Sequence, residues 1–317
     1  MPWLSYASLL AGMMVVGAYV GFSKTLTLTF PVFVLATLRF AIAAVVLLPW
    51  TFGSAINKNQ IKAILIQSFF GNFLFSICLL YGVSLSSAVA GGLIMSTLPA
   101  AVALLSAVVL KERLSHQTWL AVAMSVAAIS ILQFGGIGNN LGKSENESLV
   151  NAHILNAFLS NTDQQSPAAQ SHFVGNFLLF GAVLCEAIYV VQGKRLSGKM
   201  SANRNSALLN LAGLAFMLPF GLWQMRGFDF SQVSVPMWQL LIAYAIAASV
   251  LSTWLWLTGL RKVPASQAGV FSIGLPVTAM LVGVVFLNEK LTAFHIVALV
   301  FSVVALLLIS LQTKASA

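Results

Sequence analysis

The chain has 317 residues, of which 59% are hydrophobic and only 7% are charged, and its mean hydropathy is +0.93. So apolar a chain cannot cover a water-soluble globule with polar side chains, which excludes a soluble domain and indicates an integral membrane protein surrounded by lipid. The net charge of +9 must then be explained within a membrane protein.

A helix needs about 20 apolar residues to cross the hydrocarbon core of a bilayer. Ten apolar runs of that size are separated by polar or charged residues, so we predict an all-α integral membrane fold with ten transmembrane helices. The first run is not a cleavable secretory signal, because no basic residue precedes it. The runs are residues 4–22, 31–50, 61–81, 86–110, 117–134, 172–192, 205–225, 236–257, 264–287 and 293–311.

The basic residues predict the orientation of these helices. With the N-terminus inside, the inner loops and tail carry eleven Lys and Arg residues and the outer loops carry four. Because cytoplasmic loops hold an excess of cations, we expect both termini in the cytoplasm and the protein in the plasma (inner) membrane. The basicity therefore requires no nucleic-acid partner.

The second half of the chain repeats the first. The stretch SAVAGGLIMSTLPAAVALLSAVVLKERLS, from Ser87, aligns with PASQAGVFSIGLPVTAMLVGVVFLNEKLT, from Pro264, at a shift of 177 residues. Nearer the start of each half a shift of 170 pairs Tyr19 with Tyr189 and Lys24 with Lys194. Five spans are an odd number, so the second copy must enter the membrane from the opposite side, as an inverted repeat. We expect repeats at 1–134 and 172–317 and an extracytoplasmic linker at 135–171.

Within the linker, apolar residues recur at helical spacing, which predicts a short amphipathic helix on the outer membrane surface. An ordered loop cap without membrane contact is the alternative. The residues are Leu149, Val150, Ile154, Leu155, Phe158 and Leu159.

Glu186 is the principal candidate for function. It is the only charged residue within a helical turn on either side, and a charge at this depth normally faces a cavity or a partner. We expect it to bind solute and to alternate between protonated and charged forms as a proton-coupling group. The alternative is a hydrogen-bonded structural acid that joins helices.

Arg39 lies within the second span and is the second candidate. It could bind a substrate carboxylate or pair with Glu186. Alternatively, its long side chain snorkels outward or caps carbonyls of a neighbouring helix, and this structural role is the one we favour.

Polar stripes on the third and eighth spans complete the predicted substrate site. Serine and asparagine recur every fourth residue after Ser68, and the repeat gives the last two positions hydroxyl-bearing counterparts. The alternative role is hydrogen bonding between helices. Besides Glu186 and Arg39, the predicted site consists of Tyr19, Asn72, Ser76, Tyr189, Ser249 and Thr253.

Pro99 and Pro276 lie within spans four and nine and are the predicted gating residues. A proline inside a helix releases the carbonyl four residues before it. The kinked helices could present backbone acceptors to a solute or flex as gates. A static kink that improves packing is the alternative.

Each five-span half contains a helix that has an internal Leu-Pro and ends in a Glu-basic-Leu turn, Glu112-Arg113-Leu114 and Glu289-Lys290-Leu291. Together with Leu38-Arg39-Phe40, these features resemble EamA-type members of the drug/metabolite transporter superfamily. The resemblance implies a ten-helix carrier with a central cavity, often an exporter of amino acids or related metabolites. The linker departs from it, because this family usually joins its halves by a short connection.

An ATP-driven pump and a metalloenzyme are disfavoured, because the sequence has no phosphate-binding Gly-x-x-x-x-Gly-Lys-Ser/Thr loop and no His-Glu-x-x-His helix. We expect no enzyme, cofactor or metal, but a secondary transporter that exports small polar or amphipathic metabolites by alternating access, with protons as an optional partner. The alternatives are a flippase for a lipid or lipid-linked sugar and a non-transporting membrane receptor. The oligomeric state stays open.

Overall fold

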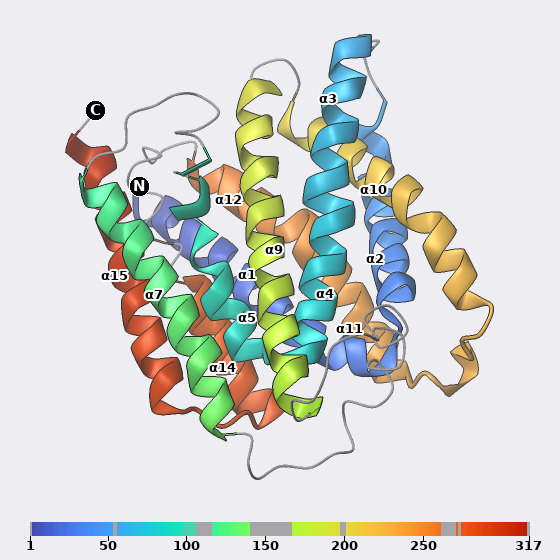
Figure 1. Cartoon of the computed structure of the whole chain (residues 1–317). Helices are drawn as coiled ribbons and strands as arrows, with labels where there is room; N and C mark the ends of the chain where they lie inside the picture. Colours follow the sequence, from blue (N-terminus) through green and yellow to red (C-terminus); the bar gives the residue numbers. More distant parts are fainter. Residues whose placement is uncertain are drawn as a thin grey trace.

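The protein is a bundle of helices, shown in the computed structural model of Figure 1. The structure describes residues 2–52, 56–98, 100–102, 104–105, 116–139, 167–196, 201–260, 271 and 274–315, and all regular elements in these ranges are helical. The longer helices are α1 (Pro2–Thr29), α2 (Val32–Leu47), α3 (Lys58–Ser68), α4 (Phe75–Leu85), α5 (Ala88–Met95), α7 (His116–Asn139), α9 (Pro167–Leu196), α10 (Ala202–Met225), α11 (Val235–Ile246), α12 (Ser252–Leu260), α14 (Gly274–Leu287) and α15 (Ala293–Ala315).

The helices have the length and composition of an integral membrane protein. Six continuous stretches in the described part are long and apolar enough to cross a bilayer, and four shorter apolar stretches lie in α5, α7, α14 and α15. Large apolar side chains such as Val45, Phe52, Phe177 and Trp223 are exposed on the outside of the bundle. A surface of this kind is typical of contact with lipid rather than with water.

Two single turns within the bundle are π-helical. The first, η2 (Phe69–Leu74), joins α3 to α4, and the second, η5 (Ala247–Leu251), joins α11 to α12. Each therefore lies inside one continuous span, Lys58–Leu85 and Val235–Trp256. π-Turns of this kind are rare inside helices and occur often at functional sites.

The helix bounds correct part of the sequence prediction at the linker. α7 continues to Asn139 and α9 begins at Pro167, so both ends of the predicted 135–171 linker are helical. Proline suits the first position of a helix, where its missing N–H has no intrahelical partner to lose. The predicted amphipathic helix lies outside the described residues.

The predicted kink at Pro276 concerns the carbonyl of Ser272, four residues earlier, and Ser272 lies outside the described residues. The described part of α14 starts at Gly274, two residues before Pro276. Pro99 lies outside the described residues, as does the first Glu-basic-Leu turn, residues 112–114.

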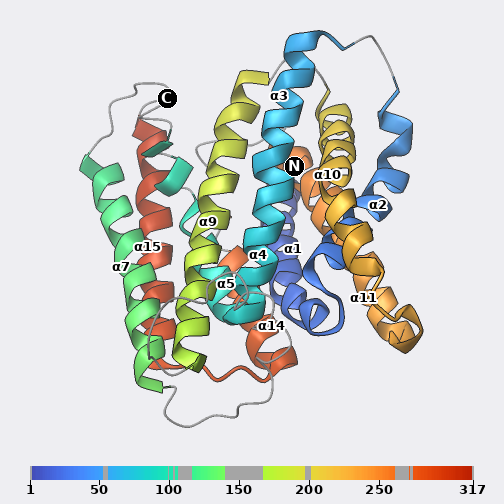
Figure 2. The same ribbon diagram turned by 45° about the vertical axis from the view of Figure 1, so that its right-hand side comes forward.

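Helices that the sequence repeat pairs with each other lie side by side. α7 packs along α15 and α2 packs along α10. The two members of each pair run in opposite directions, as the colours of Figures 1 and 2 show. α4 packs against α9, and α1 packs against α12 and α14. The start of α1 and the end of α15 lie at one end of the bundle, whereas the end of α7 and the start of α9 lie at the other.

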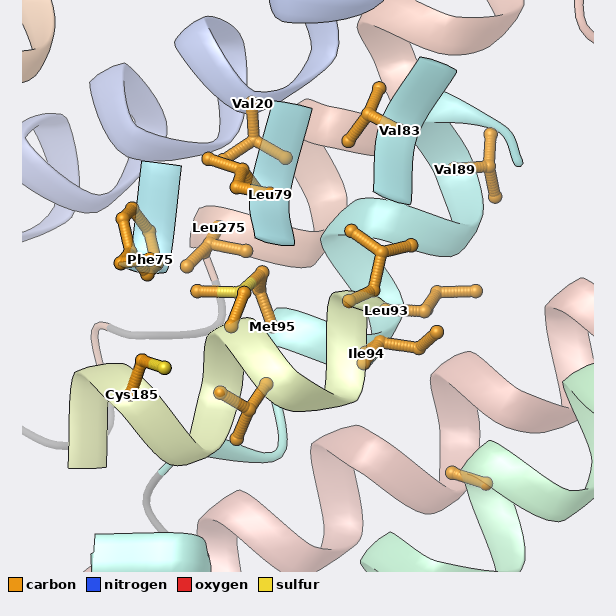
Figure 3. Close-up of a cluster of buried hydrophobic side chains, with 14 of the residues drawn as sticks. Val20, Phe75, Leu79, Val83, Val89, Leu93, Ile94, Met95, Cys185 and Leu275 are labelled. Carbon is orange, nitrogen blue, oxygen red and sulfur yellow. The ribbon is translucent and has the colours of Figure 1, made fainter. Parts of the chain in front are cut away.

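A buried apolar cluster joins both halves of the chain. Figure 3 shows side chains of α1, α4, α5, α9 and α14 meeting in it, among them Val20, Leu79, Leu93 and Leu275. Lipid removes much of the hydrophobic drive for helices to associate, so close fit must supply the stability. This cluster supplies that fit at the centre of the bundle.

Glycines let α1 and α14 approach each other closely. Gly17 and Gly21 form the spacing Gly-x-x-x-Gly on α1. A Cβ atom on Gly17 would overlap the carbonyl oxygen of Leu275, and one on Gly21 would lie 2.6 Å from Cγ1 of Val282. Small residues at this spacing are a common device for packing membrane helices.

The corner between α4 and α5 is fixed by charges at both of its helix ends. Lys24 Nζ donates to the carbonyl oxygens of Ser84, at 2.9 Å, and Ser86, at 2.8 Å. The Glu289 carboxylate accepts from the N–H groups of Ala88, at 2.7 Å, and Val89, at 2.9 Å. A cation at a helix C-terminus and an anion at an N-terminus both oppose the helix dipoles favourably.

A left-handed turn aims Glu289 at that corner. Asn288 has φ 53° just after α14 ends, a conformation that asparagine tolerates better than most residues. The Glu289 N–H then donates to the Gly283 carbonyl oxygen at 2.9 Å. The Glu-basic-Leu turn of the second half thus has a structural role in capping α5.

We expect Gly17→Ala to destabilise the protein by about 1–3 kcal/mol, because the new methyl group overlaps the α14 backbone. Gly12→Ala is the control, since its methyl group would lie 3.4 Å from the Leu255 Cβ, at ordinary contact distance. Both changes raise helix propensity equally. Thermal unfolding in detergent measures the difference, and equal midpoints for the two variants would contradict the close approach.

We expect Glu289→Gln to lower the free energy of unfolding by roughly 1–2 kcal/mol, because it removes the charge that caps α5. Lys290→Gln removes a neighbouring exposed charge and should have little effect. Chemical denaturation in detergent would compare them. A loss of stability that is the same in both variants would contradict a specific capping role for the Glu289 carboxylate.

Candidate functional site

Glu186 faces the interior of the bundle. On α9, Phe177 and Leu184 are exposed, whereas Ala182 and Val183, on the other side of the helix, are buried. At 3.6 residues per turn Glu186 falls on the side opposite Phe177 and Leu184. Its side chain is half-buried and surrounded by protein groups. The carboxylate therefore points away from lipid.

Arg39 is a cation within electrostatic range of this carboxylate. The residue is only 6% exposed, and its Nε and Nη1 have no hydrogen-bond partner among the residues that the structure describes. Its guanidinium carbon lies 4.7 Å from the ring centroid of Phe40 and 5.9 Å from that of Tyr244. Arg39 and Glu186 are within electrostatic range of each other.

Tyrosines complete the surroundings of the two charges. The rings of Tyr19 and Tyr244 meet edge to face at 5.8 Å. Tyr19 is also within electrostatic range of both Arg39 and Glu186, and Tyr189 is within range of Glu186. We call Tyr19, Arg39, Glu186, Tyr189 and Tyr244 the central polar cluster. It draws on α1, α2, α9 and α11, and therefore on both halves of the chain.

The contacts of the two predicted tyrosines correspond in the two halves. Tyr19 contacts Tyr244, and the Tyr189 carbonyl oxygen accepts from Gln67 Nε2 at 3.3 Å while its ring lies against Gly71. The shift of 177 residues that aligns the repeats also pairs Gln67 with Tyr244. Tyr244 was not a sequence prediction, although this pairing was a signal that could have found it.

Two predicted polar residues lie in the π-helical turns. Asn72 is in η2 and Ser249 is in η5, and the same shift pairs them. Asn72 Nδ2 donates to the Leu209 carbonyl oxygen of α10 at 2.6 Å, and Ser68 Oγ donates to the same oxygen at 2.9 Å. In this structure the Asn72 amide group joins helices, which was the alternative role for the stripe.

The other hydroxyl groups of the stripes are differently placed. Ser76 and Ser249 are buried, and neither Oγ has a hydrogen-bond partner in the described part of the chain. Thr253 is half-buried. The Tyr244 hydroxyl is also buried and unpartnered there.

Unpartnered buried polar groups are uncommon, because losing water without gaining a protein partner costs free energy. Here they include two of the three guanidinium nitrogens of Arg39, a phenol and two serine hydroxyls, all in the helices that form or adjoin the central polar cluster. Such groups can be satisfied by water or by a polar solute that enters the bundle. The arrangement can therefore bind a small molecule with both polar and apolar parts.

Comparison with known proteins gives the family of the chain. Residues 3–134 and 173–311 each match the model of the EamA-like transporter family. The chain belongs to the EamA-like transporter family. This match confirms the family that the two Leu-Pro segments and Glu-basic-Leu turns predicted. It also confirms that the protein is an integral membrane protein of the transporter type. Residues 135–172 separate the two matched ranges.

Relatives of known sequence extend over most of the chain. It is 34% identical over 300 residues to the "Uncharacterized transporter YetK" of Bacillus subtilis (strain 168), covering 93% of this chain and 83% of that protein. It is 21% identical over 278 residues to "Uncharacterized transporter YyaM" of the same organism, covering 86% and 82%. A crystal structure with TM-score 0.61 and 15% identity, covering 98% of both chains, shares the fold.

We expect Ser68→Ala and Ser249→Ala to have opposite effects. Ser68→Ala removes a hydrogen bond between helices and should lower stability by roughly 0.6 kcal/mol without changing solute exchange. Ser249→Ala removes a hydroxyl without a protein partner, so stability should hold while exchange changes. Thermal unfolding and exchange in proteoliposomes measure the two properties. If Ser249→Ala lost stability and kept full exchange, its hydroxyl would have a structural role.

Proposed function

We propose that this protein is a secondary transporter that exports small polar or amphipathic metabolites, such as amino acids, by alternating access. The central polar cluster is its solute site. The observation that carries this proposal is a set of unpartnered polar groups deep in an apolar bundle, contributed by helices of both halves. Ionisable residues at such depth in membrane proteins commonly mark the path of a solute or an ion.

The architecture that we propose is ten transmembrane helices in two inverted repeats. It is supported by the two separate family matches, by the opposite directions of α7 and α15 and of α2 and α10, and by the two π-turns. The start of α1 and the end of α15 lie at the same end of the bundle, which supports a topology with both termini on one side of the membrane. The charge distribution of the sequence makes that side the cytoplasm of a plasma membrane.

Alternating access requires the two halves to have two packings of similar energy around one site. The π-turns η2 and η5 are suited to this movement, because a helix with an extra residue in one turn already has irregular hydrogen bonds there. Our candidate gating residues remain Pro99 and Pro276, the latter in α14. α14 packs between α1 and α5, so its movement would alter the centre of the bundle.

Glu186 is the residue through which protons would be coupled to transport. It is the acid of the central polar cluster, and Arg39 is a cation within electrostatic range of it. A solute that changes the surroundings of Arg39 would also change the balance between charged and protonated Glu186. Proton and solute movement would then be linked through one pair of residues.

The test of this function is Glu186→Gln in proteoliposomes that contain the purified protein. We expect the variant to lose transport driven by a pH gradient and to keep exchange of solute for solute, because only the former needs a titrating group. Asp229→Asn changes an exposed acid and serves as the control. A variant that responds to the gradient like the unmodified protein would overturn proton coupling at Glu186.

Counterflow of solute separates the proposed transporter from the other two functions that the sequence allows. A receptor without transport activity would show no counterflow with any solute. A flippase would move a fluorescent lipid between leaflets and would show no exchange of water-soluble metabolites. Either result would overturn the proposed function.

A further inference from the structure

We propose that Arg39 is the anchor for a carboxylate group on the transported solute, and that Glu186 is the anion that balances Arg39 when the site is empty. This inference rests on the proposed function and names the class of its substrate, which is a small organic acid or amino acid with an apolar body. It reverses the structural role that the sequence favoured for Arg39.

The first step is that Nε and Nη1 of Arg39 do not hold helices together by hydrogen bonds within the described ranges. A structural arginine in a membrane protein caps backbone carbonyls, pairs directly with an acid or extends to the membrane surface. Arg39 is buried, and its Nε and Nη1 have no partner in the described ranges. An unpaired buried cation is costly, so a residue of this kind needs an anion that the resting structure does not supply in contact.

The second step is that the ring contacts leave the guanidinium free to bind. Phe40 and Tyr244 lie 4.7 Å and 5.9 Å from its carbon and attract its charge through their π faces. This attraction positions the group without using its N–H donors. The buried hydroxyl of Tyr244 is a further donor beside it, also without a partner among described residues.

The third step is the chemistry of the group that would fit these donors. A carboxylate has two coplanar oxygens that match the parallel N–H groups of a guanidinium. A neutral amide supplies one weaker acceptor, and an amine supplies a positive charge that Arg39 would repel. The tyrosine and phenylalanine rings offer contact to the apolar part of the same molecule. These donors therefore select an organic acid over its amide or amine.

The fourth step concerns Glu186, which is within electrostatic range of Arg39. When the site is empty this carboxylate compensates part of the Arg39 charge. A solute carboxylate brings a second negative charge to the same cation, and the two anions oppose each other. Removal of the Glu186 charge should therefore strengthen solute binding.

The experiment uses the full chain and matched pairs of acid and amide on one skeleton. The pairs are phenylalanine with its amide, leucine with its amide, and 3-phenylpropionate with its amide, each as a competitor in counterflow. We expect the acids to compete at concentrations at least about tenfold lower than their amides, since a hydrogen bond to a charged group contributes about 1.5–3 kcal/mol.

Variants of Arg39 then test the residue itself. Arg39→Gln should abolish the preference for acids, Arg39→Lys should retain part of it because the charge remains, and Glu186→Gln should tighten binding of the acids. Arg226→Gln removes an exposed arginine and should behave as the unmodified protein.

A stability measurement distinguishes binding from a structural role. If Arg39 serves only the solute, the double variant Arg39→Gln/Glu186→Gln should unfold at the same or a higher temperature than the unmodified protein without solute, because it removes both buried charges and leaves neither uncompensated. A midpoint lowered by several degrees would overturn the inference. Equal competition by acids and amides would overturn it while leaving the proposed function intact. Absence of counterflow with every solute would overturn both.

Discussion

The hydrocarbon core of a membrane offers no hydrogen-bond partner, and the structure of this protein follows from that constraint. Every regular element in the described ranges is a helix, which satisfies its backbone internally. Where helices end close together, side chains take over: Lys24 and Glu289 cap the corner between α4 and α5. Asn72 and Ser68 bond to the carbonyl of Leu209. Against this background the unpartnered donors of Arg39 stand apart.

The charged residues of the central polar cluster break the symmetry of the two halves. Tyr19 and Tyr189 correspond in the repeat, and each contacts the opposite half of the chain. Tyr19 contacts Tyr244, and Tyr189 contacts Gln67. The shift of 170 residues that pairs them places Val16 opposite Glu186 and Leu209 opposite Arg39. One half thus supplies the anion and the other the cation. The repeated scaffold positions the site, whereas single substitutions within each copy give it charge.

The sequence predicted those features that depend on local composition. Apolar runs predicted the positions of the six long spans in the described part of the chain, because a span must bury about 20 consecutive residues in lipid whatever its neighbours are. Glu186 and Arg39 were visible for the same reason, as charges in apolar surroundings. The helical ends of the 135–171 segment were missed, since Gly135 and Gly136 in α7 read as linker when taken alone. A glycine-containing helix can still persist when its neighbours pack against it.

Features that depend on tertiary contact could not be predicted. Asn72 and Ser76 belong to one stripe, yet Asn72 bonds to α10 while the Ser76 hydroxyl has no partner among described residues. The difference arises because Gly213 of α10 admits the Asn72 side chain, with only 2.9 Å between its own hypothetical Cβ and the Cβ of Asn72. Tyr244 was missed because its role comes from Tyr19 and Arg39, which lie more than 200 residues earlier in the chain.

How tightly Glu186 is paired with Arg39 matters for a transporter. A direct, well-bonded ion pair in this dry interior would be strong, and a solute would have to break it before binding. An arginine with no anion within electrostatic range would instead make the empty site too costly to fold around. Glu186 is within electrostatic range of Arg39, and Nε and Nη1 of Arg39 have no hydrogen-bond partner among the described residues. This arrangement lies between the two limits. In the proposed site, this arrangement would keep the empty protein stable and leave Nε and Nη1 of Arg39 open to an incoming anion.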